Sequence, residues 1–333
     1  MLSPKLSFPA LGEFKFVESI LAGSAPLEER PPQFRNWFPA GDDAAIFDGW
    51  LATKDLSVEN VHFRMDWSTP EQAVEKHIVS NVSDISAMGG IPRIALLGAC
   101  LNKKWDAGMR ARVSKAFAEG FAKRGITLVG GDTVVGDEAV FSTTLLGVQA
   151  AEKPLLRSGA RPGDGIYVAG TLGKSAAGLW ILLNHPEEAG RFKNLVEYHL
   201  NPQIHESAGA ELARLGGCGA CMDISDGLSS ELNHLALSSG VSLEIDLARV
   251  PVDPEVREMA EFFHISPMEF AINGGEEYQL LFSFFDTDVI LNQENVCLGK
   301  IFKLGTVKEG SGVYCIGPEG KRNLLNAQAW SHL

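Results

Sequence analysis

The sequence predicts a mixed α/β fold of the α+β type, divided into two domains over residues 1–150 and 151–333. First, 333 residues are about twice the roughly 150 residues typical of one domain. Second, short apolar strand patterns alternate with helical patterns along the N-terminal half. Third, the loop-rich stretch Arg157-Ser-Gly-Ala-Arg-Pro-Gly-Asp164 lies where the second half begins. With 45% hydrophobic residues, each half can bury a core of its own.

The N-terminal half is expected to form a sheet with helices on one face. One helix begins after Pro70, because an apolar stripe recurs from there at intervals of three and four residues, with Val74, Ile78, Val82 and Ile85. A second helical pattern covers 105–123. Strands are expected over 44–47, 51–53, 94–101, 127–129 and 139–148.

The C-terminal half is expected to alternate in the same way. Helical patterns cover 175–183, 206–215, 227–237 and 254–263. Strands are expected over 166–169, 279–284 and 313–316. Cys218-Gly-Ala-Cys221 is interpreted as two small buried thiols in a glycine-rich turn, because a structural zinc site would require a second such pair.

Composition excludes several classes of protein. The chain has 29 basic and 42 acidic residues, a net charge of −13, whereas a nucleic-acid binder needs a concentrated basic face. No stretch approaches the ~20 apolar residues of a membrane-spanning helix, and Pro4 and Pro9 interrupt the start of the chain where a signal peptide would be apolar. The five cysteines are sparse and odd in number. These features predict a cytoplasmic protein with no nucleic-acid or membrane partner.

Acidic residues recur in short signals that are mostly flanked by glycine. These signals are Gly41-Asp-Asp43, Lys54-Asp55, Ser83-Asp84, Gly130-Gly-Asp132, Asp223-Ile-Ser-Asp226-Gly227 and Gly274-Gly-Glu-Glu277. Any one alone is a common turn or helix start. Asp84, however, follows by one turn Asn81, which falls within the apolar stripe of the first helix, and buried polar groups need partners. Converging carboxylates would need cations among them, so the set predicts a phosphate site with several Mg²⁺ ions.

Two other patterns are interpreted as ordinary structure. Gly163-Asp164 is expected to be a solvated turn that opens a strand. The segment from Val168 to Ser175 follows a strand and opens a helix, as a phosphate-binding loop would, but Val168 stands where that pattern requires glycine. The sequence contains no GxSxG, HExxH or GxGxxG motif, so it predicts no serine nucleophile, metalloprotease or dinucleotide site.

Seven motifs occur in an informative order. They are Gly41-Asp-Asp-Ala-Ala45, Val61-His-Phe63, Asn81-Val-Ser-Asp-Ile-Ser-Ala-Met-Gly89, Gly130-Gly-Asp-Thr133, Arg157-Ser-Gly-Ala160, Met222-Asp-Ile-Ser-Asp-Gly-Leu-Ser229 and Asn273-Gly-Gly-Glu276. Together they resemble the thiamine-monophosphate kinase family of the AIR-synthetase-like ATP-binding superfamily, from Gly12 to Trp330. The resemblance implies a two-domain α/β fold, a homodimer formed partly by the N-terminal sheet, and phosphorylation of thiamine monophosphate to thiamine diphosphate with ATP and Mg²⁺.

The resemblance also assigns roles to individual residues. It implies that the metal ions are held by Asp43, Thr53, Asp55, Asp84, Asp132 and Asp223, with Asp226 at a further metal. It implies contacts to ATP from Gly131, Asp132, Arg157 and Ser225. It places the thiamine substrate near His62, Glu276 and Trp330, with Trp330 stacking on a ring. No catalytic side-chain base is expected, because the accepting group is already a phosphate anion.

The chain departs from the family pattern at four positions. Lys54 replaces a hydroxyl residue and is expected to bring a cation next to Asp55, and Lys174 replaces an aspartate at a helix start. Glu277 lengthens a carboxylate, and Ala329 replaces a glycine. These departures leave two alternatives: a superfamily member with another small-molecule phosphate acceptor, or a non-catalytic nucleotide-binding homologue.

Overall fold

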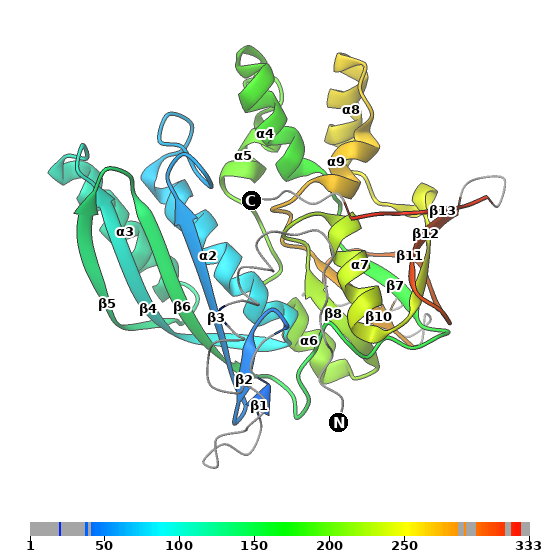
Figure 1. The fold of residues 1–333 in the computed structure, drawn as a ribbon. Coiled ribbons are helices and arrows are strands. Elements are labelled where there is room, and N and C mark those ends of the chain that lie inside the picture. Colours follow the sequence, from blue (N-terminus) through cyan, green and yellow to red (C-terminus); the bar gives the residue numbers. More distant parts are fainter. Residues whose placement is uncertain are drawn as a thin grey trace.

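In the computed structural model the chain folds into two β-sheets with flanking helices, which confirms the predicted α/β fold (Figure 1). The structure describes residues 41–285, 298–316 and 321–327, together with residues 20, 37, 38 and 290. The strands of the first sheet end at Gln149, and those of the second begin at Gly165. Across this described part, no helix combines the length and the apolar character needed to cross a bilayer.

The first sheet has the order β1-β2-β3-β6-β4-β5. All neighbours are antiparallel except β4 and β5, which are parallel and joined through α3. Pairing with β6 along nine residues extends β3 well beyond the 51–53 expected from its apolar residues. The elements are β1 (Trp37–Phe38), β2 (Ala45–Phe47), β3 (Trp50–Val58), α2 (Pro70–Ala87), β4 (Gly90–Asn102), α3 (Ala107–Ala122), β5 (Thr127–Gly136) and β6 (Val140–Gln149).

Helix α2 confirms the strongest prediction from the sequence. Thr69 caps it in a reciprocal capping box with Gln72, and Pro70 occupies the first turn. Its predicted apolar stripe is fully buried against the first sheet and α3. The polar Asn81 is buried as well, and its side-chain amide donates to the His77 carbonyl at 2.9 Å. The helix therefore buries residues of both kinds along most of its length.

The two faces of the first sheet differ. Residues alternate along β3, so Leu51 and Thr53 are buried on the side of α2, whereas Lys54 and Leu56 are exposed on the other side. Strand β5 is exposed along nearly its whole length, including the apolar Val129 and Val135. Exposed apolar surface of this kind is typical of contact sites for other molecules.

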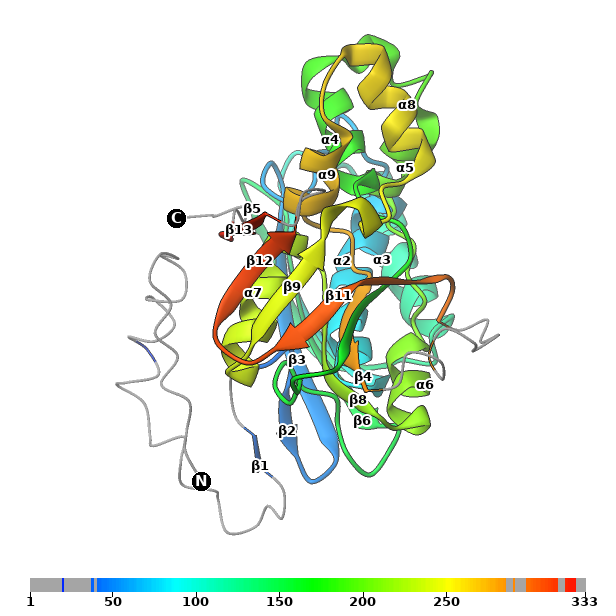
Figure 2. The same cartoon turned by 90° about the vertical axis from the view of Figure 1, so that its right-hand side faces the viewer.

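The second sheet has the order β13-β12-β9-β11-β7-β10-β8, with β9 and β12 as its parallel pair. Figures 1 and 2 show α4, α5, α8 and α9 grouped at one end of this sheet. The strands are β7 (Gly165–Ala169), β8 (Cys218–Asp223), β9 (Ser242–Asp246), β10 (Leu280–Phe284), β11 (Ile301–Lys308), β12 (Gly312–Ile316) and β13 (Arg322–Leu324). The helices are α4 (Lys174–Asn184), α5 (Lys193–Leu200), α6 (Ala208–Leu215), α7 (Leu228–Ser239), α8 (Pro254–Phe263) and α9 (Pro267–Asn273).

Two expectations for this half are wrong. Cys218 and Cys221 lie in strand β8 rather than in a turn, because this segment pairs with β10 and Cys221 stands opposite Phe282. Both thiols are free, and only Cys221 is fully buried. Asp164 does lie in a turn, but it is buried rather than solvated, and its carboxylate accepts the Arg161 amide at 2.9 Å.

Helix α2 also joins the two halves of the chain. It packs on the first sheet on one side and on β8 and α6 of the second half on the other. Gly209 of α6 lies so close to α2 that a Cβ atom there would stand 1.6 Å from the Ser86 carbonyl oxygen. The Gly209 amide also donates to the Ser86 hydroxyl at 3.3 Å. The close approach therefore requires glycine at position 209.

We expect Gly209→Ala to lower the free energy of unfolding by about 1–3 kcal/mol, although alanine favours helices, because the added methyl group must push α6 away from α2. Gly190→Ala is the matched control, since a Cβ atom at Gly190 would meet nothing within 4 Å. Urea denaturation of both variants measures the difference. Equal stability of the two variants would contradict the close contact.

Candidate active site

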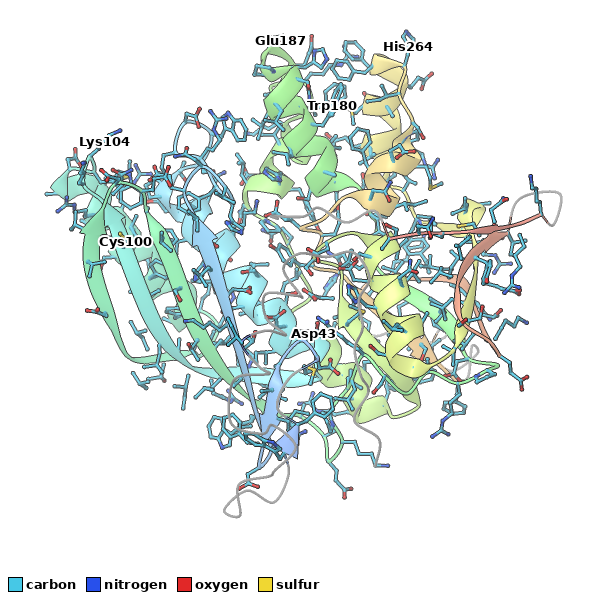
Figure 3. The ribbon with its side chains drawn as sticks, in the orientation of Figure 1. Asp43, Cys100, Lys104, Trp180, Glu187 and His264 are labelled. Atoms are coloured by element: carbon cyan, nitrogen blue, oxygen red, sulfur yellow. The ribbon has the colours of Figure 1, made fainter. Side chains whose placement is uncertain are left out.

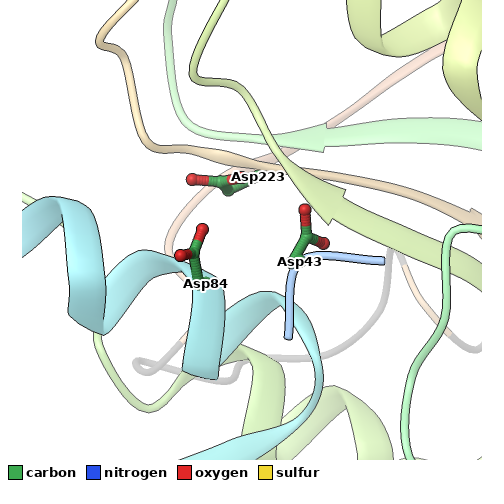
Figure 4. Close-up of side chains that lie close together, drawn as sticks. All are labelled: Asp43, Asp84 and Asp223. Carbon is green, nitrogen blue, oxygen red and sulfur yellow. The ribbon is translucent and has the colours of Figure 1, made fainter. Parts of the chain in front are cut away.

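Three aspartates from three elements converge between the two sheets (Figure 4). Asp43 precedes β2, Asp84 lies in the last turn of α2, and Asp223 ends β8. One carboxylate oxygen from each lies within 4.8 Å of the others. Because Asp223 belongs to the second half of the chain, the cluster exists only when both halves are docked.

The charges of this cluster are poorly compensated by protein groups. Burial and the neighbouring Asp43 raise the pKa of Asp223 to about 7. Burial, followed by the charges of Asp55 and Asp223, raises the pKa of Asp84 well above its usual range. The Oδ2 atom of Asp43 is buried and has no hydrogen-bond partner within the described part of the chain. Carboxylate oxygens crowded in this way are suitable ligands for a hard cation such as Mg²⁺.

Hydroxyl groups surround the carboxylates. Thr53 Oγ1 donates to Asp84 Oδ2 at 2.5 Å, and Ser83 donates to Asp223. The largely buried Asp55 accepts a hydrogen bond from Ser80. The structure therefore brings together five of the residues expected to hold metal, namely Asp43, Thr53, Asp55, Asp84 and Asp223.

Arg157 fixes the loop that carries Asp43. Its Nε and Nη2 atoms donate to Asp43 Oδ1 at 3.0 and 2.5 Å. Its backbone amide donates to the Asp42 carboxylate at 3.0 Å. Burial, together with Asp43, raises the pKa of Asp42 to about 7. Asp42 was not among the candidate residues, although the doubled aspartate of Gly41-Asp-Asp43 was visible in the sequence.

Ser225 and Asp226 lie just beyond Asp223 and are partly exposed. The Asp226 amide donates to Glu231 at 2.9 Å, and the Ser225 carbonyl accepts the Glu276 amide at 2.7 Å. Gly227 has a φ of 120°, a value that permits the sharp exit into α7. The loop is thus held at the edge of the aspartate cluster.

Gly131 and Asp132 lie apart from the cluster of their own chain. Both are exposed on β5, the edge strand of the first sheet. Three strand spacings separate β5 from β3, which corresponds to roughly 14 Å. The structure does not bring these two residues to the carboxylates within one chain.

One cleft is lined by both His62 and Glu276, the two described residues expected near the thiamine substrate. Lys76 of α2 enters it and donates to the Glu276 carboxylate at 2.8 Å and to the His62 carbonyl at 3.2 Å. The His62 ring accepts the Val58 amide on Nδ1. Trp330, the third expected substrate residue, lies outside the described residues.

The ion pair at the floor of this cleft involves residues that sequence reasoning missed. Burial and the Lys76 ammonium lower the pKa of His199 to about 3, so its ring is neutral. Burial opposes ionisation of Glu276, but the Lys76 ammonium brings its pKa below its usual range. Lys76 is buried although it is charged, and its position on the face of α2 that also carries Asp84 was the available signal.

Lys54 does not lie beside the metal-binding candidates. Successive residues of a strand point to opposite faces, so Lys54 faces away from Thr53 and Asp55. Its ammonium donates to Ser142 Oγ at 2.7 Å on the outer face of the sheet. The expectation that it brings a cation next to Asp55 is wrong.

Lys174 has local partners at the start of α4. Its ammonium lies 4.0 Å from the centre of the Tyr198 ring. Glu277 Oε1 accepts the amides of Gly173 and Ser175, each at 3.0 Å. A carboxylate of the protein therefore occupies the start of this helix, where a phosphate-binding loop would place its phosphate.

We expect Asp84→Asn to raise the melting temperature of the protein in EDTA, because it removes one charge from a buried group of like charges. The same change should lower the additional stabilisation given by Mg²⁺, because a ligand charge is lost. Thermal denaturation with and without Mg²⁺ measures both effects. Asp137→Asn, at an exposed residue, is the control. Unchanged Mg²⁺ stabilisation in Asp84→Asn would remove Asp84 from the cation site.

We expect Lys174→Asp to destabilise the protein by roughly 1–2 kcal/mol, because it removes the contact with Tyr198 and places a second carboxylate near Glu277. Burial already raises the pKa of Glu277 to about 8. Lys174→Met removes the charge without adding another and should cost less. Urea denaturation ranks the three proteins, and greater stability of Lys174→Asp would contradict the assigned contacts.

Family models and curated relatives place the chain in the same protein family. Residues 41–149 and 161–323 match the N-terminal and C-terminal domains of AIR synthase related protein. Thiamine-monophosphate kinase of Methanopyrus kandleri is 38% identical over 82% of this chain and 84% of that kinase. The Bacillus subtilis kinase is 34% identical over 81% and 85%, respectively.

Solved structures agree with the sequence relatives. The structure described as AaThiL complexed with AMPPCP and TMP superposes with a TM-score of 0.82 at 32% identity, covering 99% of this chain and all of that one. Thiamine monophosphate kinase from Aquifex aeolicus gives 0.77 at 32% identity, covering 94% and 99%. The chain belongs to the thiamine-monophosphate kinase family, among the proteins related to AIR synthase.

Proposed function

We propose that this chain phosphorylates thiamine monophosphate to thiamine diphosphate with ATP and Mg²⁺, in the cytosol and as a homodimer. One observation carries the proposal. The carboxylates of Asp43, Asp84 and Asp223 lie at one end of α2, and the cleft with His62 and Glu276 lies beside the same helix. A cation site for phosphates and a pocket for an organic molecule are thus aligned along one rigid element.

Different residues of the site would bind the metal ions and the phosphates of ATP and of the acceptor. Asp43, Thr53, Asp55, Asp84 and Asp223 would hold Mg²⁺, with Asp226 at the rim of the same site. Bound Mg²⁺ would neutralise phosphate oxygens and so lessen the repulsion between donor and acceptor. Arg157 and Ser225 lie at the edge of the cluster, where they can contact ATP.

The proposed reaction needs orientation more than proton transfer. The attacking group is a phosphate oxygen that is already anionic, so none of these side chains has to act as a base. His199 is neutral and Glu276 is paired with Lys76, which suits a role in binding rather than in acid–base chemistry. The task of the site is to hold the two phosphates in line.

The position of Asp132 supports a dimer in which two chains build each site. In a single chain Asp132 is exposed on β5, far from Asp84, and the neighbouring apolar surface of the sheet is also exposed. A symmetric dimer that covers this surface would bring Gly131 and Asp132 of one subunit to the aspartate cluster of the other. This arrangement accounts for an ATP-binding role of residues that lie so far from the remaining candidates.

The non-catalytic alternative rested on Lys54 and Lys174. Neither lysine contacts the aspartate cluster, because Lys54 lies on the outer face of the sheet and Lys174 lies over Tyr198. This removes the reason to favour that alternative.

The direct test is incubation of the purified protein with ATP, Mg²⁺ and thiamine monophosphate, followed by chromatography of thiamine diphosphate. We expect product only when all three are present, and none from Asp84→Asn. The exposed Asp137→Asn should act like the unaltered protein. ATP binding without product would contradict the proposal and favour a diverged homologue.

Mixing two inactive variants tests the shared site. We expect Asp84→Asn and Asp132→Asn to be inactive separately, whereas co-expressed chains should regain about one quarter of the activity. Half of the dimers would then be mixed, and each mixed dimer would contain one intact site. Activity of Asp132→Asn alone, or an inactive mixture, would contradict a site shared between subunits.

A further inference from the structure

Helix α2 fixes the distance between the cleft and the aspartate cluster, because it contributes Lys76 to the first and Asp84 to the second. Lys76, Ser80 and Asp84 follow one another at intervals of four residues, so they lie along one face of the helix. Lys76 and Asp84 are eight residues apart, which corresponds to about 12 Å along the axis. An acceptor whose phosphate lies near Asp84 must therefore extend past Lys76 toward the start of α2.

The wall of the cleft at that end is aromatic. Trp67 lies just before α2 and lines the same cleft as His62 and Glu276. The Arg64 guanidinium lies 4.2 Å from the centre of its ring. Arg64 in turn forms two hydrogen bonds with the Asp66 carboxylate, at 3.0 and 2.6 Å. The Arg64 guanidinium thus covers one face of the indole, and the Asp66 carboxylate neutralises the charge of Arg64.

We propose that Trp67 is a specificity-determining residue that packs against the heteroaromatic end of the phosphate acceptor, with the Arg64–Asp66 pair holding the indole in place. This inference rests on the proposed function, which supplies an acceptor with rings at one end and a phosphate at the other. A half-buried indole in a cleft that also contains Phe63 and Leu179 offers a flat apolar surface. An electron-rich indole face also attracts a cationic ring.

The position of Trp67 accounts for discrimination between acceptors. The aspartate cluster recognises phosphate and cannot distinguish one phosphate ester from another. Discrimination must therefore come from the cleft, which Trp67 lines together with Lys76 and Glu276. Contact with Trp67 should strengthen binding of the acceptor without affecting ATP.

The test compares Trp67→Ala, Trp67→Leu and Trp67→Phe with Trp180→Ala. Trp180 lies on α4 (Figure 3), packs against Phe263 and Phe270, and does not line the cleft. We expect Trp67→Ala and Trp67→Leu to raise the KM for thiamine monophosphate roughly tenfold, with little change in the KM for ATP. Trp67→Phe should restore most of the affinity, and Trp180→Ala should leave both values unchanged.

Calorimetric binding of thiamine monophosphate to the same proteins separates this inference from the proposed function. Weaker binding to Trp67→Ala and Trp67→Leu, recovered in Trp67→Phe, would support the role of Trp67 even if the unaltered protein made no product. Equal affinity in all variants, or an equal rise in both KM values, would overturn it. The leucine variant retains apolar bulk, so the comparison remains available if the alanine variant does not fold.

Discussion

The crowding of three carboxylates at one point, two of them buried and that of Asp84 half-buried, is the constraint on which the rest of the structure depends. Like charges in a site of low polarity repel strongly, and the raised pKa values of Asp84 and Asp223 reflect that cost together with burial. Each of the three aspartates accepts a hydrogen bond from one neighbour: Asp43 from Arg157, Asp84 from Thr53 and Asp223 from Ser83. These contacts position the carboxylates but do not satisfy all of their oxygens, since Asp43 Oδ2 has no partner within the described residues.

The backbone beside this site is strained and also well supported. Glu276 and Tyr278 both have left-handed φ values, 59° and 53°, which are unusual for residues other than glycine. The Glu276 amide donates to the Ser225 carbonyl at 2.7 Å, and the Tyr278 amide donates to the Ile224 carbonyl at 2.8 Å. Such bonds can hold strain of this kind where a side chain must point in one direction. Here the result is that Glu276 faces Lys76 across the junction of the two halves.

Sequence reasoning predicted the elements whose apolar pattern is strong and failed where the cause lies far away in the chain. Helix α2 was evident from its stripe and from Pro70. The pairing of Lys76 with Glu276 was not, because 200 residues separate them and a lysine in a helix is normally solvated. Lys54 was placed wrongly because neighbours in sequence lie on opposite faces of a strand. Strands β9 and β11 were missed because both depend on partners far away in the chain: β9 pairs with β11 and β12, and β11 pairs with β7 and β9.

Binding of a cation at the aspartate cluster is linked to the docking of the two halves of the chain. Asp43 and Asp84 belong to the first half and Asp223 to the second, so a cation that binds all three stabilises the docked arrangement over any separated one. Without a cation, repulsion within the cluster opposes docking. The apolar contacts of α2, the glycine contact at Gly209 and the Lys76–Glu276 pair must then hold the halves together. The stability of this interface and the affinity for the cation are therefore properties of the same contacts, and a change in either alters the other.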